Sequence, residues 1–303
     1  MKDDITSATP ASGQGRTKAA REPAAAAKPR AEGLARFDAH GIAPDLIARY
    51  HDDPDFVTAL ARGLSVMLAL SDKRRRVTIA QVAHLTGIPR AAARRSLHTL
   101  VKLGFVTMDD ARRFYLRPRV LSFSHAYLSA SPIAVLSQPI LDRLSDETRE
   151  ACSLAVLDGE EIVYVARSAS SRIMSPSLNV GRRLPAFCTS VGHVLLAELP
   201  PSELDDFLAH VRFVPYTEHT VNSPDALRAI LRRTHEHGYS FTSGQIERRL
   251  ATLAVPVRDT GGHYVAGINV ILQGRPVTAE QAAEQFLRPL QDAAMELGSL
   301  LLP

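Results

Sequence analysis

Cysteine is scarce in this sequence. Its 303 residues include only Cys152 and Cys188, and there is no CxxC pair. Two isolated cysteines exclude a disulfide framework and give no indication of a thiolate metal site. They fit the reducing environment of the cytosol, so we expect a cytoplasmic protein. A chain of this length can bury enough apolar surface to fold without cross-links.

Long apolar runs are absent too. The first twenty residues, MKDDITSATPASGQGRTKAA, begin with acidic side chains and contain no apolar core, which excludes a signal peptide. No later run is long and apolar enough to span a bilayer. The sequence therefore gives no indication of a membrane partner.

Motifs for catalysis and nucleotide binding are also lacking. Neither GxGxxG nor GxxxxGK[ST] occurs. Cys188 and His193 lie five residues apart, but no oriented acid accompanies them, and two core residues are the favoured interpretation. His235 and His237 are two residues apart and so do not share a helix face, which disfavours a metal site. We expect no enzyme activity, no cofactor and no metal.

Positive charge, in contrast, is concentrated in one segment. The net charge of the chain is only +4. Between Lys73 and Arg119, however, there are twelve lysines and arginines and only two acids, Asp109 and Asp110, which is a local excess of ten positive charges. Such clustering in a segment that otherwise has the pattern of a folded domain is typical of a phosphate-binding surface.

Residues 54–118 have the pattern of three helices followed by a β-hairpin. Apolar residues recur at helical spacing over residues 56–68 and predict a first helix. Thr78 can cap a second helix that stops at Gly87, and Pro89 suits the first turn of a third. The stretch FVTMDDARRFYLRP then predicts two short strands around a tight turn. This order predicts a winged helix-turn-helix.

A basic stripe follows the predicted third helix. Arg90, Arg94, His98 and Lys102 succeed one another at four-residue steps. Such a stripe is more often a solvated face, but its place on the third helix, beside a basic hairpin, favours DNA. A helix fits the major groove, where arginine can bind guanine bidentately and lysine can contact phosphate. The predicted DNA-binding residues are Thr78, Arg90, Arg94, Arg95, His98, Thr99, Lys102, Arg112 and Arg113.

The remaining segments divide into three parts. Residues 1–53, rich in Ala, Pro, Lys and Gly, predict a disordered arm. Helical patterns over residues 119–148 carry more apolar surface than one domain needs and indicate connecting helices that self-associate. A two-fold dimer would place two reading helices on a pseudo-palindromic operator in double-stranded DNA. Hairpin and helix patterns over residues 149–303 predict an α+β domain with a mainly antiparallel sheet.

Five stretches resemble one family of bacterial regulators. They are LARGLSVMLAL, TIAQVAHLTGIPRAAARRSLHTLVKLGFV, RPRVLSFSHAYLS, GRRLPAFCTSVGHVLLA and LAVPVRD. The chain resembles the IclR family of transcription regulators and, within it, the PcaR, PobR and CatR branch. The resemblance implies a winged-helix N-terminal domain, a GAF-like effector domain, a homodimer or homotetramer, and a small carboxylate effector. It also implies control of aromatic-acid catabolism through the β-ketoadipate pathway.

The resemblance further implies where the effector binds. In the segment SGQIERRL, Ser243 stands where many relatives have an acidic residue, and Arg249 stands in place of a glycine. The effector-pocket positions carried over from the family are Ile173, Ser190, Val191, Ser243, Thr252, Asn269 and Ile271.

The residues also indicate a carboxylate site independently of the resemblance. The turn FCTSVG leads into a predicted helix that begins at Thr189, and the first amides of a helix can bind a carboxylate. Alternatively, Thr189 is only an N-cap and the nearby arginines are only surface residues. The arginines that could pair with a carboxylate are Arg167, Arg182 and Arg183.

Two hypotheses of function follow from these patterns. The leading hypothesis is a DNA-binding transcription factor that responds to a small aromatic or dicarboxylic acid. The other is a small-molecule-binding protein or enzyme with an accessory basic N-terminal domain. Salt distinguishes them, because DNA affinity that depends on these arginines falls steeply as the salt concentration rises.

Overall fold

The computed structural model describes residues 37–38, 41–42, 44–50, 52–71, 76–168, 179–274 and 276–303. Three short elements come first: β1 (Phe37–Asp38) pairs antiparallel with β2 (Gly41–Ile42), and α1 (Pro44–Arg49) follows. They fall within the segment predicted as a disordered arm, most of which lies outside the described residues.

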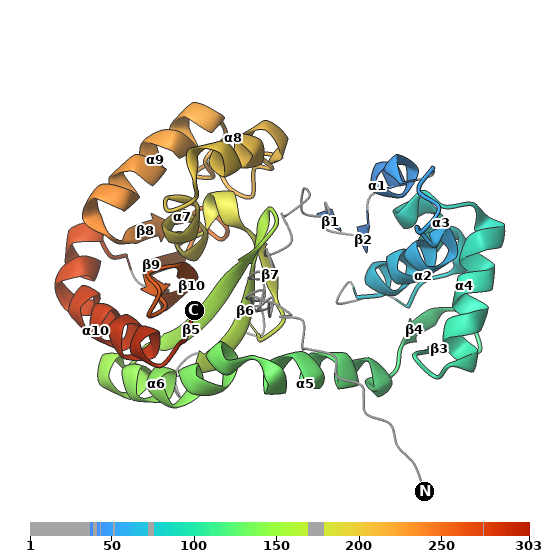
Figure 1. Ribbon diagram of the computed structural model, residues 1–303, viewed down its shortest axis with the longest axis horizontal. Coiled ribbons are helices and arrows are strands. Elements are labelled where there is room, and N and C mark those ends of the chain that lie inside the picture. The colour runs from blue at the N-terminus through green and yellow to red at the C-terminus, as the bar shows by residue number, and fades with distance from the viewer. Residues whose placement is uncertain are drawn as a thin grey trace, which may run out of the picture. The chain divides into compact units, whose positions relative to one another are not determined.

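Three helices and a hairpin form the next part, as the sequence predicts (Figure 1). They are α2 (Thr58–Ala69), α3 (Ile79–Thr86), α4 (Arg90–Lys102), β3 (Val106–Met108) and β4 (Phe114–Leu116). A capping box starts α3: the Thr78 hydroxyl accepts from the Gln81 backbone, and the Gln81 side chain accepts from the Thr78 backbone. Gly87, with φ of 66°, ends α3 in the left-handed region that favours glycine.

A small apolar core holds these elements together. Each contributes buried side chains: Val66 from α2, Val82 from α3, Leu97 from α4, Val106 from β3 and Phe114 from β4. The buried stripe of α4 faces this core, so its charged stripe is left on the outside.

Connecting helices follow the hairpin. They are η1 (Pro118–Val120), α5 (Leu121–Ala130) and α6 (Pro132–Thr148). Every residue of α5 is at least partly exposed, whereas α6 buries Ile140, Leu141 and Leu144. No single described helix has the length and apolar character needed to cross a bilayer; only the pair 118–130 and 132–148, bent by 80°, passes that test together.

The C-terminal part is built on a six-stranded sheet in which all neighbours are antiparallel. The strand order is β7-β6-β5-β10-β9-β8. The strands are β5 (Ala151–Asp158), β6 (Glu161–Ser168), β7 (Arg183–Pro185), β8 (Ser240–Ser243), β9 (Leu250–Arg258) and β10 (Tyr264–Gln273). The predicted α+β architecture with an antiparallel sheet is confirmed.

Helices cover both faces of this sheet (Figure 1). One face packs on α6 and α10 (Ala279–Ser299), and the other on α7 (Ser190–Leu196), which follows η2 (Ala186–Cys188). Around α7 lie α8 (Pro201–His210) and α9 (Pro224–His237). Because side chains alternate along a strand, Ile268 and Val270 join the α10 core while Asn269 and Ile271 face α7.

Candidate DNA-binding and effector-binding sites

The charged face of α4 is open to solvent. Ala93, Leu97 and Leu100 anchor the helix in the core. Within the described residues, neither Arg90 nor Arg94 forms an ion pair. The predicted contact residues that α4 exposes are Arg90, Arg94, Arg95, His98, Thr99 and Lys102. Cations without acidic partners on one helix face can bind phosphates or base edges without first breaking an internal contact.

Two of the predicted DNA-binding hydroxyls already make internal hydrogen bonds. The Thr78 hydroxyl accepts from the Gln81 backbone N–H at 3.3 Å and is half-buried. The Thr99 hydroxyl donates to the Arg95 carbonyl at 3.0 Å. Thr78 therefore caps α3, and Thr99 retains only acceptor capacity toward a DNA base.

The wing is organised by Asp109. Its Oδ1 accepts from the Arg113 backbone N–H at 2.9 Å, and its Oδ2 lies 2.9 Å from an Arg113 guanidinium nitrogen. The same oxygen binds Arg76 at 3.2 Å, and the Arg76 guanidinium stacks on the Tyr115 ring. Arg113 is thus held by an acid, while Arg112, with φ of 55°, is exposed at the turn. Sequence reasoning assigned both arginines to DNA and missed this pairing.

These contacts lower the pKa of Asp109 from its ordinary value of 3.8 to about 2. The largest cause is the hydrogen bond from the Arg113 backbone, followed by the side chains of Arg113 and Arg76. Because the folded-state pKa is depressed, the carboxylate stabilises the wing above pH 4, and this contribution is lost as the pH falls toward 2.

Replacing Asp109 with asparagine is expected to loosen the wing at neutral pH. The amide keeps the shape of the carboxyl group but loses the charge that holds Arg113 and Arg76. Amide hydrogen exchange over residues 106–116 should become faster in Asp109→Asn and stay unchanged in the exposed neighbour variant Asp110→Asn. Equal exchange in both variants would show that Asp109 does not organise the hairpin.

A small cavity lies between α7 and the sheet. Its volume is about 20 Å³, roughly the space of one water molecule. Five predicted effector residues border it: Thr189, Ser190, Val191, Thr252 and Asn269. Residues more than seventy positions apart in the sequence therefore meet at one site, as the family resemblance implies.

A chain of three hydroxyls forms one side of the cavity. Ser190 Oγ lies 2.7 Å from Thr252 Oγ1, which lies 2.8 Å from Thr242 Oγ1. All three side chains are buried. Three hydroxyl protons serve two hydrogen bonds within the chain, so the chain retains one O–H that can donate to a ligand.

The start of α7 is committed to structural contacts. The Thr189 hydroxyl accepts from the Gly192 backbone N–H at 3.1 Å, so Thr189 is an N-cap. His193 bonds the Phe187 carbonyl at 2.8 Å and the Ser240 hydroxyl at 3.1 Å, and burial lowers its pKa to about 4. Burial raises the pKa of Cys188 to about 12. A neutral thiol and a neutral imidazole with structural partners do not form a nucleophilic pair.

The three predicted arginines have different surroundings. Arg183 pairs with Asp158 at 2.7 Å and Glu161 at 2.6 Å, and it belongs to the rim of the sheet. Arg167 and Arg182 are half-buried, and their charges lower the pKa of Tyr164, which burial nevertheless raises to about 12. Since Tyr164 borders the cavity, both arginines add positive potential beside it without lining it.

Three further predicted residues do not border the cavity or lie outside the described chain. Ser243 is exposed at the end of β8. Ile271 is buried in the apolar core beneath α7. Ile173 lies outside the described residues.

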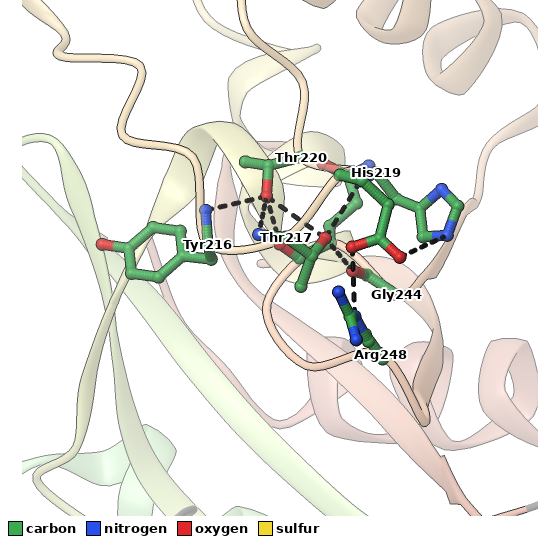
Figure 2. A network of polar contacts seen from close by, with 8 residues as sticks. Tyr216, Thr217, His219, Thr220, Gly244 and Arg248 are labelled. Atoms are coloured by element: carbon green, nitrogen blue, oxygen red, sulfur yellow. Dashed lines mark hydrogen bonds and ion pairs between the residues drawn. The ribbon is translucent and has the colours of Figure 1, made fainter.

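A loop between α8 and α9 supports one wall of the cavity. The Thr217 hydroxyl donates to the Gly244 carbonyl, and the Thr220 hydroxyl donates to the Gln245 carbonyl at 2.6 Å (Figure 2). The backbone N–H groups of residues 216 and 217 donate in turn to the Thr220 hydroxyl. Gln245 borders the cavity, so this network fixes a wall segment that comes from SGQIERRL.

Sequence reasoning missed several cavity residues. Gln245 adjoins Ser243, in the segment already singled out for its departure from relatives, so only the choice of residue was wrong. The other residues carry no local signal, because strand pairing and η2 bring them to the cavity. The missed lining residues are Tyr164, Leu184, Cys188, Thr242, Gln245, Ile246 and Leu250.

Comparison with known proteins identifies the family. Residues 125–298 match the family described as "Bacterial transcriptional regulator IclR C-terminal", and residues 59–110 match the "IclR helix-turn-helix domain". The chain belongs to the IclR family.

Individual relatives of this IclR-family protein are regulators. The Pca regulon regulatory protein of Pseudomonas putida is 41% identical over 87% of this chain and 93% of that protein. The p-hydroxybenzoate hydroxylase transcriptional activator of Acinetobacter baylyi is 33% identical over 82% of this chain and 93% of its own. The crystal structure of a regulator from Rhodococcus sp. RHA1 matches with a TM-score of 0.68 and 37% identity over 81% of this chain and 98% of that one.

The family membership sets the class of function. This IclR-family protein is a DNA-binding regulator of transcription and not an enzyme, as its sequence predicts. The described residues also contain no group of three or more His, Cys, Asp or Glu side chains that could hold a metal ion.

Proposed function

We propose that this regulator is a homodimer that binds a pseudo-palindromic operator through α4 and the wing, and that a small aromatic carboxylate in the α7 cavity changes that binding. In this proposal residues 54–118 bind DNA, residues 119–148 connect and self-associate, and residues 149–303 bind the effector. The observation that carries it is the presence, in one chain, of an unpaired cationic helix face and a cavity with a free hydroxyl donor.

The DNA-binding half of the proposal is supported by charge and anchoring. The α4 arginines are exposed, while the opposite side of the helix is buried in the core. A helix held rigidly from behind can present side chains to a major groove with little loss of conformational entropy. Arg112 at the turn is the wing cation best placed for phosphate, since Arg113 is held by Asp109.

Self-association is supported by exposed apolar surface. Leu121, Phe123 and Tyr127 of α5 are 64%, 61% and 54% exposed. On α2, Leu60 and Leu64 are 61% and 46% exposed at helical spacing. Such surface is costly in water and favours a partner. A second copy of the chain is the partner that would also provide two reading helices for two half-sites.

The effector class is supported by the chemistry of the cavity and by the relatives. The O–H of the hydroxyl chain can donate to a carboxylate, and the neighbouring charges of Arg167 and Arg182 favour an anion. The 33% identical relative is named as the activator of p-hydroxybenzoate hydroxylase, an enzyme of aromatic-acid metabolism by that name.

The size of the cavity indicates how an effector acts. A volume of about 20 Å³ does not admit an aromatic ring. Ring binding therefore requires α7 or the wall at Gln245 to move. A ligand that binds an open conformation better than this one shifts the population toward it, and only that difference in affinity can change DNA binding.

Thermal unfolding against a panel of acids tests the proposal. We expect 4-hydroxybenzoate, or another aromatic acid of the panel, to raise the melting temperature by several degrees at about one hundred times its Kd, because it binds only the folded state. Intermediates of the β-ketoadipate pathway complete the panel. The control ligand is 4-hydroxybenzyl alcohol, which keeps the ring but lacks the carboxylate and should leave the melting temperature unchanged. If no acid shifts the melting temperature, the effector proposal is wrong.

A further inference from the structure

Two buried polar atoms on the α7 face of the sheet have no hydrogen-bond partner among the described residues. They are Ser153 Oγ and Asn269 Oδ1, in side chains that are 0% and 1% exposed. Strand register makes them direct neighbours, because Asn269 of β10 pairs with Ser153 of β5. A buried polar atom without a partner costs stability, and a ligand that supplies one is a physical reason for its presence.

The open atom of Asn269 is an acceptor. The Asn269 amide hydrogen-bonds the Tyr164 side chain in the sense that favours the phenolate, which makes the Asn269 N–H the donor of that contact. The carbonyl oxygen Oδ1 then has no donor, and the adjacent Ser153 hydroxyl has no partner of either kind among the described residues. Asn269 and Tyr164 both border the cavity. This end of the site accommodates a ligand O–H and disfavours a carboxylate.

The opposite chemistry lies on the neighbouring strand. Thr252, at the centre of the hydroxyl chain, pairs with Ile271, which is two residues from Asn269 on the same strand face. Strand spacing puts the Cα atoms of Thr252 and Asn269 about 8 Å apart. One donor end and one acceptor end at that separation suit a benzene ring with its two polar groups on opposite sides.

We propose that Asn269 and Ser153 determine effector specificity by accepting and sharing a hydrogen bond with a ring hydroxyl opposite the carboxylate, so that the regulator prefers a para-hydroxy aromatic acid to the same acid without the hydroxyl. The inference rests on the proposed function, since it assumes that an aromatic carboxylate occupies this cavity. It assigns Ser153, which does not border the cavity, a role through its contact position beside Asn269.

Titration calorimetry of the full chain with 4-hydroxybenzoate and with benzoate tests the inference. The wild-type protein should bind 4-hydroxybenzoate at least tenfold more tightly, because benzoate leaves the buried acceptor unpaired. In Asn269→Leu the preference should fall to near unity while benzoate binding is kept. Ser153→Ala should reduce the preference partly. Because Asn269→Leu removes a buried unpaired atom, its melting temperature without ligand should not fall.

A matched control and two contrary outcomes complete the test. Gln273→Leu replaces an exposed amide on the same strand and should leave the preference intact. If wild-type protein binds both acids equally, or Asn269→Leu and Ser153→Ala keep the full preference, the inference is wrong although the proposed function stands. If neither acid binds wild-type protein, while DNA binding is intact, this inference is overturned together with the assignment of an aromatic effector.

Discussion

Replacing Arg94 with alanine is expected to weaken binding to the operator at least tenfold. Arg94 is exposed in the middle of α4, and no described acid pairs with it. A bidentate contact between arginine and guanine contributes about 1–3 kcal/mol, and a dimer on two half-sites uses it twice. The expected loss of about 2–6 kcal/mol exceeds the 1.4 kcal/mol that corresponds to a factor of ten in Kd.

A gel-shift or fluorescence-anisotropy titration with an operator duplex selected from genomic fragments measures this loss. Arg232→Ala, an exposed arginine on α9, is the matched control and should bind as tightly as wild type. The effector-induced rise in melting temperature should be unchanged in Arg94→Ala. Wild-type affinity should also fall steeply with salt, as expected for phosphate contacts and not for an accessory domain. Unchanged operator affinity in Arg94→Ala would rule out α4 as the reading helix.

Replacing Gly192 with alanine is expected to destabilise the C-terminal domain. A Cβ at this position would lie 2.0 Å from the Ala186 carbonyl oxygen and 2.5 Å from the Ala186 Cα. Both are backbone atoms, so the clash is relieved only if the first turn of α7 moves away from η2. Overpacking of this kind costs about 1–3 kcal/mol. The same turn carries Ser190 and Val191, so effector binding should weaken as well.

Urea denaturation and the effector-induced melting shift report these two effects separately. Gly63→Ala is the matched control, because a Cβ on Gly63 of α2 meets nothing within 4 Å. Alanine in place of a helical glycine should stabilise by about 0.5–1 kcal/mol. Stability and effector response equal to wild type in Gly192→Ala would mean that α7 does not pack on η2 as described.

The DNA-binding part could be predicted well because its signals are local. The capping box at Thr78, the glycine at position 87 and the basic stripe of α4 each lie within a few residues of sequence. Helix periodicity and capping operate at that range, so a linear pattern indicates them. The error concerned Arg113, whose partner Asp109 is also local, because charge counting does not say which cations an acid has already paired.

The effector cavity was predicted only in part because it is made of distant pieces. The position of Ser190 came from family resemblance, whereas no pattern in the sequence pointed to Tyr164 or Thr242. Thr242 reaches the cavity because β8 pairs with β9, and Tyr164 because β6 lies beside β5 in the antiparallel sheet. Strand order is a property of the packed domain, since it is the burial of both sheet faces that selects it.

The sequence by itself determined that this is an IclR-family regulator with a winged helix whose third helix presents arginines, since helical period, caps and charge are properties of contiguous residues. Only the tertiary structure decided that Asp109 holds Arg113, that Thr189 is an N-cap, and that Ser153 and Asn269 bury unpaired polar atoms side by side. Hydrogen bonding and burial depend on which groups meet in space, and antiparallel pairing brings together residues more than one hundred positions apart.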